Sequence, residues 1–174
     1  MLRPGLIGFA LWALAAAASA QDATAGAAAG GGGPTPIAVE AAAAKGTLKN
    51  PYTDDQKDIV EQGHKLFFNF SCNGCHGGTG GGGMCPPLIN DVWVYGGDDD
   101  TLFRLVTLGT VALQAKGYVR RGHENVVGPM PPFGSLIPGA DDLWKILTFI
   151  RSAYNGDPKY KFGSPPPPPP PPDA

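Results

Sequence analysis

Cys72, Cys75 and His76 stand close together in the middle of the chain and carry its most specific chemical signal. The Cys-x-x-Cys-His spacing is the covalent attachment pattern of c-type haem. Two thiols three residues apart can reach the two vinyl groups of one porphyrin, and the histidine that follows is then held beneath the iron as its proximal ligand. The motif therefore predicts one covalently bound haem c, attached by the two cysteines and ligated by His76.

A zinc site is the competing interpretation, because Cys85 could complete a Cys₃His set with the three residues of the motif. The chain has three cysteines and no second Cys-x-x-Cys pair, which is too few for a disulfide framework. A secretory leader and a downstream Met-Pro pair also favour haem. Cys85 is then left over, and its apolar neighbours predict that it is buried.

The two ends of the chain do not have the composition of a packed domain. Residues 1–20 have the short positive start, apolar run and small-residue cleavage site of a secretory signal peptide, with an uncleaved anchor as the alternative. Residues 21–49 are rich in alanine and glycine and predict a disordered linker. A proline-rich tail at 164–174 is expected to be disordered as well. One haem-binding domain is thus expected at 50–163, in a periplasmic protein.

Charge excludes some classes of partner. The chain has 13 basic and 15 acidic residues and a net charge of −2, which argues against nucleic acid or an anionic membrane surface as the main partner. The leader's apolar run is too short to span a bilayer comfortably, so we do not expect an integral membrane protein. We also expect the protein to be a monomer. The acidic residues at 98–100 and the basic stretch at 116–123 are either a solvated surface or a docking patch for a redox partner.

Three segments have the periodicity and end signals of helices, which predicts an all-α domain. A capping box at 53–56 opens the first helix. The second helix is expected to begin at 100–101 and to end at Gly109, with a loop over 110–128. The third begins at 141–142 and ends at 155–156.

The Cys-x-x-Cys-His segment resembles the haem site of class I c-type cytochromes. The resemblance implies an all-α class I cytochrome c fold, with helices packed around one covalently bound haem and with the first and last helices crossing at a glycine and an aromatic residue. Gly63 and Phe67 match that pair, and Ile146 and Phe149 match the residues that meet them. A glycine in mid-helix costs about 1 kcal/mol relative to alanine, and a close helix crossing explains it.

The segment from Cys85 to Leu88 is similar to the Gly-Pro-x-Leu segment of the same class. Carried over, Pro86 would accept a hydrogen bond from His76 and orient it, and Leu88 would line the haem pocket. Cys85 stands where glycine is usual, so it would be strained if that position needs a positive φ.

Trp93 and Tyr95 follow this segment and are further candidates for the haem pocket. Their N–H and O–H groups need partners when they are buried. Haem propionates would be such partners, and the alternative is that both residues are ordinary core aromatics with a polar tip.

Met130 is the candidate for the second axial ligand, because it stands among prolines in a segment unlike a typical core. In class I cytochromes a methionine before a proline, well downstream of the haem motif, fills this position. Met1 lies in the leader, and Met84 would have to cross to the opposite haem face through a short glycine loop. His123 is the rival sixth ligand.

The segments around 80–96 and 122–134 further resemble periplasmic cytochromes of pyrroloquinoline-quinone (PQQ) alcohol dehydrogenases, including the cytochrome cL type that serves methanol dehydrogenases. The resemblance implies an electron-transfer protein rather than an enzyme. It would take single electrons from the reduced dehydrogenase by outer-sphere transfer and pass them to another cytochrome or a terminal oxidase. A haem-based ligand sensor or a haem enzyme subunit is the alternative if Met130 does not ligate iron.

Overall fold

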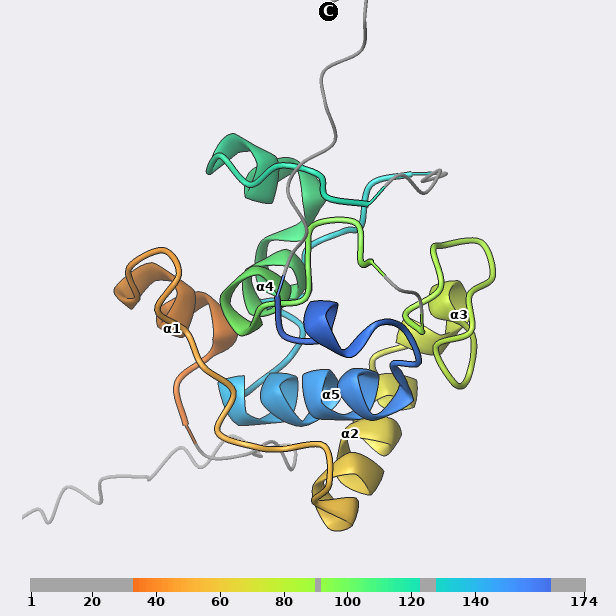
Figure 1. Ribbon diagram of the computed structural model, residues 1–174. Coiled ribbons are helices and arrows are strands. Elements are labelled where there is room, and N and C mark those ends of the chain that lie inside the picture. The colour runs from red at the N-terminus through yellow and green to blue at the C-terminus, as the bar shows by residue number, and fades with distance from the viewer. Residues whose placement is uncertain (1–32, 90–91, 123–127, 164–174) are drawn as a thin grey trace, which may run out of the picture.

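The computed structural model describes residues 33–89, 92–122 and 128–163 (Figure 1). These residues contain no strand, so the predicted all-α fold is confirmed. The predicted signal peptide at 1–20, the proline-rich tail and His123 lie outside the described residues. Within the described part of the chain, no helix is long and apolar enough to cross a membrane. The helices are α1 (Pro36–Ala42), α2 (Lys57–Asn69), α3 (Cys72–His76), α4 (Asp99–Ala115), α5 (Ala140–Ala153) and the short 3₁₀ helix η1 (Pro158–Tyr160).

Helices α2 and α5 cross at Gly63, as the sequence predicts (Figure 1). A Cβ atom at this position would overlap the carbonyl oxygen of Lys145 and would lie 3.0 Å from Cβ of Phe149. Phe67 is buried one turn further on, and its ring centroid lies 5.2 Å from that of Phe149. Only glycine allows the two backbones to approach this closely, so the crossing explains the mid-helix glycine.

The first predicted helix begins later than expected. Thr53 and Gln56 form a turn that precedes α2, in which the Gln56 side chain accepts the Thr53 N–H at 2.8 Å. The Thr53 hydroxyl donates to Asp55 rather than accepting a helix N–H, and Gln56 itself is the N-cap residue without a side-chain cap bond. Only one half of the predicted capping box is therefore present.

The linker predicted at 21–49 is wrong for residues 33–49, which pack against the rest of the domain. Thr35 caps α1 by accepting the Ala38 N–H at 3.3 Å, and Pro36 occupies the first turn, where its missing N–H costs nothing. Pro36 and Glu40 are buried, and α1 packs on α4. The folded domain thus begins before residue 50.

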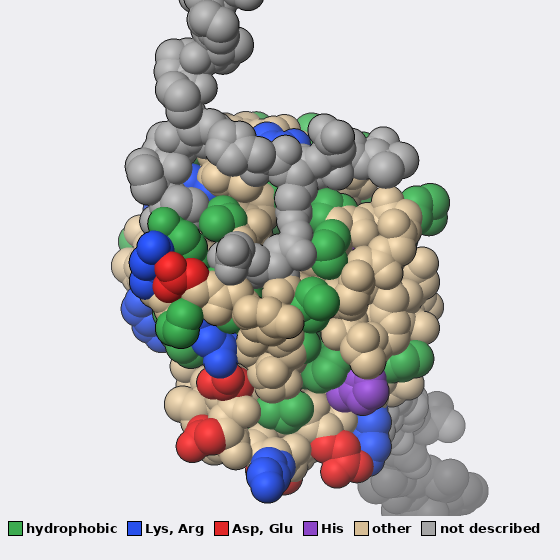
Figure 2. Space-filling model, turned by 45° about the vertical axis from the view of Figure 1, so that its right-hand side comes forward, with side chains coloured by type: hydrophobic (Ala, Val, Ile, Leu, Met, Phe, Trp, Pro, Cys, Tyr) green, Lys and Arg blue, Asp and Glu red, His purple; other side chains and the backbone are tan. Residues whose placement is uncertain are grey.

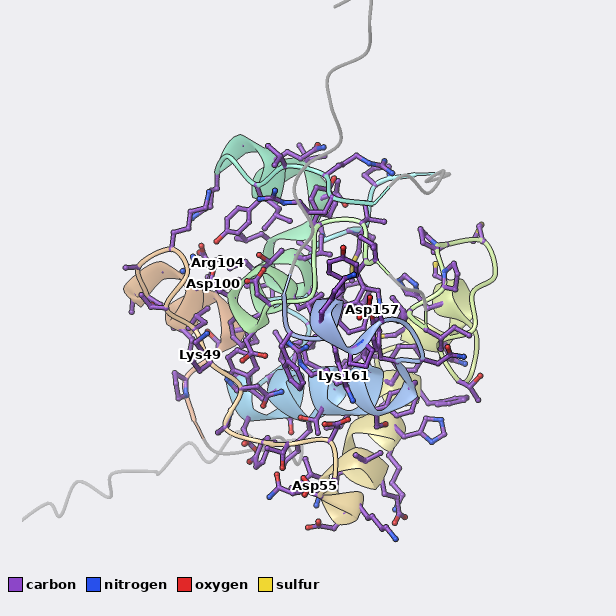
Figure 3. The ribbon with its side chains drawn as sticks, viewed as in Figure 1. Lys49, Asp55, Asp100, Arg104, Asp157 and Lys161 are labelled. Carbon is purple, nitrogen blue, oxygen red and sulfur yellow. The ribbon has the colours of Figure 1, made fainter. Side chains whose placement is uncertain are left out.

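Arg104 on α4 holds α1 in place, and Figure 3 shows it beside Asp100. Its guanidinium donates to Asp100 at 3.0 Å and to the Glu40 carboxylate at 2.5 Å. It also donates to the carbonyls of Glu40, Ala43 and Ala44 at 3.2, 2.7 and 3.1 Å. All five N–H donors of the side chain are used, so a buried cation also satisfies the C-terminal carbonyls of α1.

Gly109 ends the regular helical turns where the sequence predicts, but the chain becomes helical again directly after Gly109. It has φ 73° and ψ 170° inside α4, which continues to Ala115. The predicted loop over 110–128 is therefore wrong for its first six residues. The kink changes the direction of the helix next to the segment that carries Met130, as described below.

Candidate haem site

A cavity between α3, α4 and α5 contains about 950 Å³ of space outside the protein atoms, part of it open to solvent. Its walls are mostly apolar side chains, including Leu102, Val106 and Ile150. The structure brings nearly all the predicted site residues to this cavity. It is lined by Cys72, His76, Pro86, Leu88, Trp93, Tyr95 and Met130, and Cys75 lines an adjoining hollow that shares Cys72, His76 and Met130.

Helix α3 is a single turn that presents the Cys-x-x-Cys-His motif to the cavity. Cys72 and His76 are four residues apart and so lie on one face of the turn. The turn is bounded by Ser71 in the left-handed region, with φ 59°, and by Gly77, with φ 77°. Burial raises the pKa of the Cys72 thiol to about 11, so this sulfur stays protonated near neutral pH.

The orientation of the His76 ring is set by Pro86. The distance from His76 Nδ1 to the Pro86 carbonyl oxygen is 2.9 Å, so the predicted contact is present. A carbonyl can only accept, which places the proton on Nδ1 and leaves the Nε2 lone pair for a metal. Burial lowers the pKa of His76, against the opposing effect of this hydrogen bond, and the ring is accordingly suited to act as a neutral ligand.

The glycine-rich segment after α3 folds back tightly and returns the chain to the cavity at Cys85. Gly82 has φ 93° and donates to the His76 carbonyl at 2.8 Å, and Cys85 donates to the Cys75 carbonyl at 3.1 Å. Among the described residues Ser71 is the one non-glycine with a positive φ, so the strain considered for Cys85 is absent. Cys85 is half-buried rather than buried.

Trp93 and Tyr95 are both buried and both line the cavity. The Trp93 indole N–H donates to the Leu88 carbonyl at 2.7 Å. Its polar group is therefore satisfied inside the protein, which favours the core-aromatic interpretation for Trp93. Burial raises the pKa of Tyr95, and the positive charge of Arg120 opposes that shift.

The segment that carries Met130 is attached to α4 at its kink, through residues that the sequence analysis missed. Met130 N–H donates to Thr110 Oγ1 at 3.0 Å, and Thr110 N–H donates to the Met130 carbonyl at 3.0 Å. A Cβ atom at Gly109 would lie 2.7 Å from the same Met130 carbonyl. The available signal is a glycine followed by threonine inside an apolar helical pattern. This pattern predicts the helix end but not the segment that binds there.

The donor set of this cavity fits a c-type haem. It offers two thiols on one turn, an imidazole with its Nε2 available, a thioether at Met130 and an apolar wall. Within the described residues, no three His, Cys, Asp or Glu side chains are grouped closely enough to hold a metal ion. The residues of the alternative zinc site are all described, and the structure does not assemble them into such a group.

The family model described as cytochrome C oxidase, cbb3-type, subunit III matches residues 58–150. The match begins in α2 and ends in α5, and it includes both the Cys-x-x-Cys-His motif and Met130. No curated protein and no solved structure matches the chain.

Proposed function

Because the chain belongs to the family described as cytochrome C oxidase, cbb3-type, subunit III, it is a c-type cytochrome with a haem-binding domain, and we propose that it is a monomeric, periplasmic carrier of single electrons. One observation carries the proposal. His76 and Met130, which approach from segments far apart in the chain, line the same cavity as Cys72. This arrangement offers one nitrogen and one sulfur ligand to a single iron.

We assign the binding of one haem c to the residues of this cavity. Cys72 and Cys75 would attach it through thioether bonds, and His76 and Met130 would ligate its iron. The Pro86 carbonyl holds the imidazole ring, and Leu88 contributes to the apolar wall that excludes water. When bound, the haem supplies a one-electron change at its iron.

Coordination of the iron by both His76 and Met130 would favour electron transfer over catalysis. With His76 and Met130 both bound, the iron would have no free position for peroxide, nitrite or oxygen. Ligands that stay in place through the change of charge also keep reorganisation small. The protein would therefore exchange electrons by the outer-sphere route with partners that dock at its surface.

The donor that we propose is a PQQ-dependent methanol or alcohol dehydrogenase, and the acceptor is a downstream cytochrome or terminal oxidase. The resemblance of residues 80–96 and 122–134 to the cytochromes of such dehydrogenases, including the cL type, supports the donor. The secretory leader at 1–20 supports the periplasmic location.

Absorption spectroscopy of the purified holoprotein tests the axial ligands. We expect a low-spin haem that binds carbon monoxide poorly and a ferric methionine–iron charge-transfer band. Met130→Ala should remove that band, whereas His123→Ala should leave it unchanged. A high-spin ferric spectrum with rapid ligand binding would instead favour a haem-based sensor or a haem enzyme subunit.

Rapid mixing tests the donor. The oxidised protein is mixed with a purified PQQ methanol or ethanol dehydrogenase, with and without its alcohol, and haem reduction is followed by absorption. Reduction that requires the alcohol supports the assignment. Absence of reduction by either dehydrogenase would remove the proposed donor but would leave the axial ligands and the electron-carrier role intact.

A further inference from the structure

We propose that Thr110 is a positioning residue for the Met130 ligand, and that the kink of α4 at Gly109 is built to mount the Met130 segment. This inference rests on the proposed function, because it takes Met130 to be an axial ligand. Thr110 would then set how readily another ligand displaces Met130 from the iron.

The kink replaces helix hydrogen bonds by bonds to the Met130 segment. In an uninterrupted helix the Thr110 N–H would donate to the Val106 carbonyl four residues earlier. Here it donates to the Met130 carbonyl at 3.0 Å, and the Val106 carbonyl accepts the Phe133 N–H at 2.9 Å. The Thr107 carbonyl accepts the Gly134 N–H at 3.0 Å in the same way. The backbone groups that the kink releases thus bind the segment on both sides of its prolines.

Gly109 is the residue that makes this arrangement possible. Its φ of 73° lies in a region that other residues rarely adopt. A Cβ atom there would also lie 2.7 Å from the Met130 carbonyl and 2.8 Å from the Pro132 nitrogen. The close approach of α4 to the segment therefore needs glycine for its conformation and for its lack of a side chain.

The Thr110 hydroxyl holds the one backbone donor of the proline-rich stretch. Residues 129–132 read Pro-Met-Pro-Pro, and proline has no N–H, so Met130 carries the only amide donor among them. That N–H donates to Thr110 Oγ1 at 3.0 Å. Both backbone polar groups of Met130 are accordingly bonded to Thr110, and both residues line the cavity.

Thr110→Val keeps the branched shape of the side chain and removes its acceptor. In this variant the Met130 N–H has no Thr110 hydroxyl to bond while Met130 is bound to the iron. Once Met130 is displaced and its segment has moved away, water can accept a hydrogen bond from this N–H. Loss of one such bond corresponds to about a tenfold change in an equilibrium constant. The equilibrium constant for displacement of Met130 from the iron should therefore rise about tenfold.

Imidazole titration of the ferric holoprotein measures this equilibrium through the loss of the methionine–iron charge-transfer band. We expect Thr110→Val to lower the imidazole concentration at half-displacement about tenfold, and Thr110→Ser, which keeps the hydroxyl, to stay near the wild-type value. Thr107→Val is the matched control on the same helix, because Thr107 is buried and its hydroxyl has no hydrogen-bond partner among the described residues. It should leave the midpoint unchanged.

The outcomes separate this inference from the proposed function. If Met130→Ala removes the band but Thr110→Val titrates like the wild type or like Thr107→Val, the positioning role is overturned and the ligand assignment stands. If Thr110→Ser lowers the imidazole concentration at half-displacement as much as Thr110→Val does, the hydroxyl is not responsible and the positioning role is again overturned. If Met130→Ala retains the band, both the ligand assignment and the role of Thr110 are overturned.

Discussion

Replacing Arg104 by methionine should lower the free energy of unfolding by about 3–5 kcal/mol, the range for breaking a buried ion pair by removing one partner. The side chains of Arg104, Glu40 and Asp100 are only 4%, 5% and 3% exposed, so solvent does not screen their interaction. Methionine keeps the apolar stem of the side chain and removes all five donors. The effect therefore measures the guanidinium itself.

The remaining contacts place the expected loss within that range rather than above it. Glu40 keeps its ion pair with Lys116 at 2.8 Å, and Asp100 keeps the Tyr118 hydroxyl at 2.6 Å and the Leu48 N–H at 3.2 Å. Neither carboxylate is left without a partner. The carbonyls at the end of α1 lose their donor, and the cost of about 1–3 kcal/mol for an unsatisfied group, if they remain buried, offsets what the retained partners of the carboxylates save.

Urea unfolding of the holoprotein, followed by circular dichroism and haem absorption, gives the free energy. Hydrogen exchange should show that residues 36–44 lose protection before α2 and α5 do. Lys65→Met is the control, because the Lys65–Glu61 pair has both side chains 68% exposed and should contribute less than about 1 kcal/mol. A loss for Arg104→Met as small as that of the control would refute the view that this buried network holds α1 to the domain.

Three further predictions follow from the geometry. Gly63→Ala should destabilise the holoprotein by at least about 3 kcal/mol in urea unfolding, because its Cβ would overlap the Lys145 carbonyl. Gly74→Ala is the control and should cost far less, because its Cβ would meet no atom of the described residues within 4 Å; equal losses would contradict the close crossing. The rate of reduction by the donor dehydrogenase should change little with ionic strength, because the described residues that line the hollow beside Cys75 include no Lys, Arg, Asp or Glu. Figure 2 shows apolar side chains along the middle of one face of the molecule. A steep salt dependence in rapid mixing would contradict this prediction. Burial alone would raise the pKa of Asp100, but hydrogen bonds from Tyr118, backbone amides and Arg104 hold it below its usual range. The stability that this carboxylate contributes is present above about pH 4 and is lost as the pH falls through the lowered folded-state pKa. The free energy of unfolding, measured in urea from pH 6 to pH 3, should therefore fall more for the wild type than for Asp100→Asn. Parallel pH profiles for the two proteins would contradict this prediction.

Features that depend on local spacing could be predicted from the sequence. The Cys-x-x-Cys-His motif needs only one turn of backbone to bring Cys72 and His76 to one face. The all-α class follows from helix periodicity. The contact between His76 and Pro86, which spans ten residues, was implied by the resemblance to class I cytochromes and not by spacing. The mid-helix position of Gly63 also indicated a crossing, because no end signal stands beside it.

Helix α1 could not be predicted because its stability comes from a residue 64 positions away in the chain. Short helices gain most of their stability from tertiary packing, and the alanine-rich composition of this segment suits a linker equally well. The Thr35-Pro36 pair is a helix-start signal that the composition obscured. The acidic residue Glu40 gave no helix signal in the sequence, because its partner Arg104 lies far away in the chain.

Gly63 and Gly109 show why the same residue type supports two different structures. Each glycine lies in an apolar helical pattern, and each allows another part of the backbone to come close. At Gly63 the neighbour is a helix, so α2 stays regular, whereas at Gly109 the neighbour is the Met130 segment, whose amides compete with the helix for the carbonyls of α4. The sequence specifies that a close approach occurs at both positions. Hydrogen bonds between residues twenty or more positions apart decide which backbone comes close and whether the helix is interrupted. Periodicity within one helix carries no information about them.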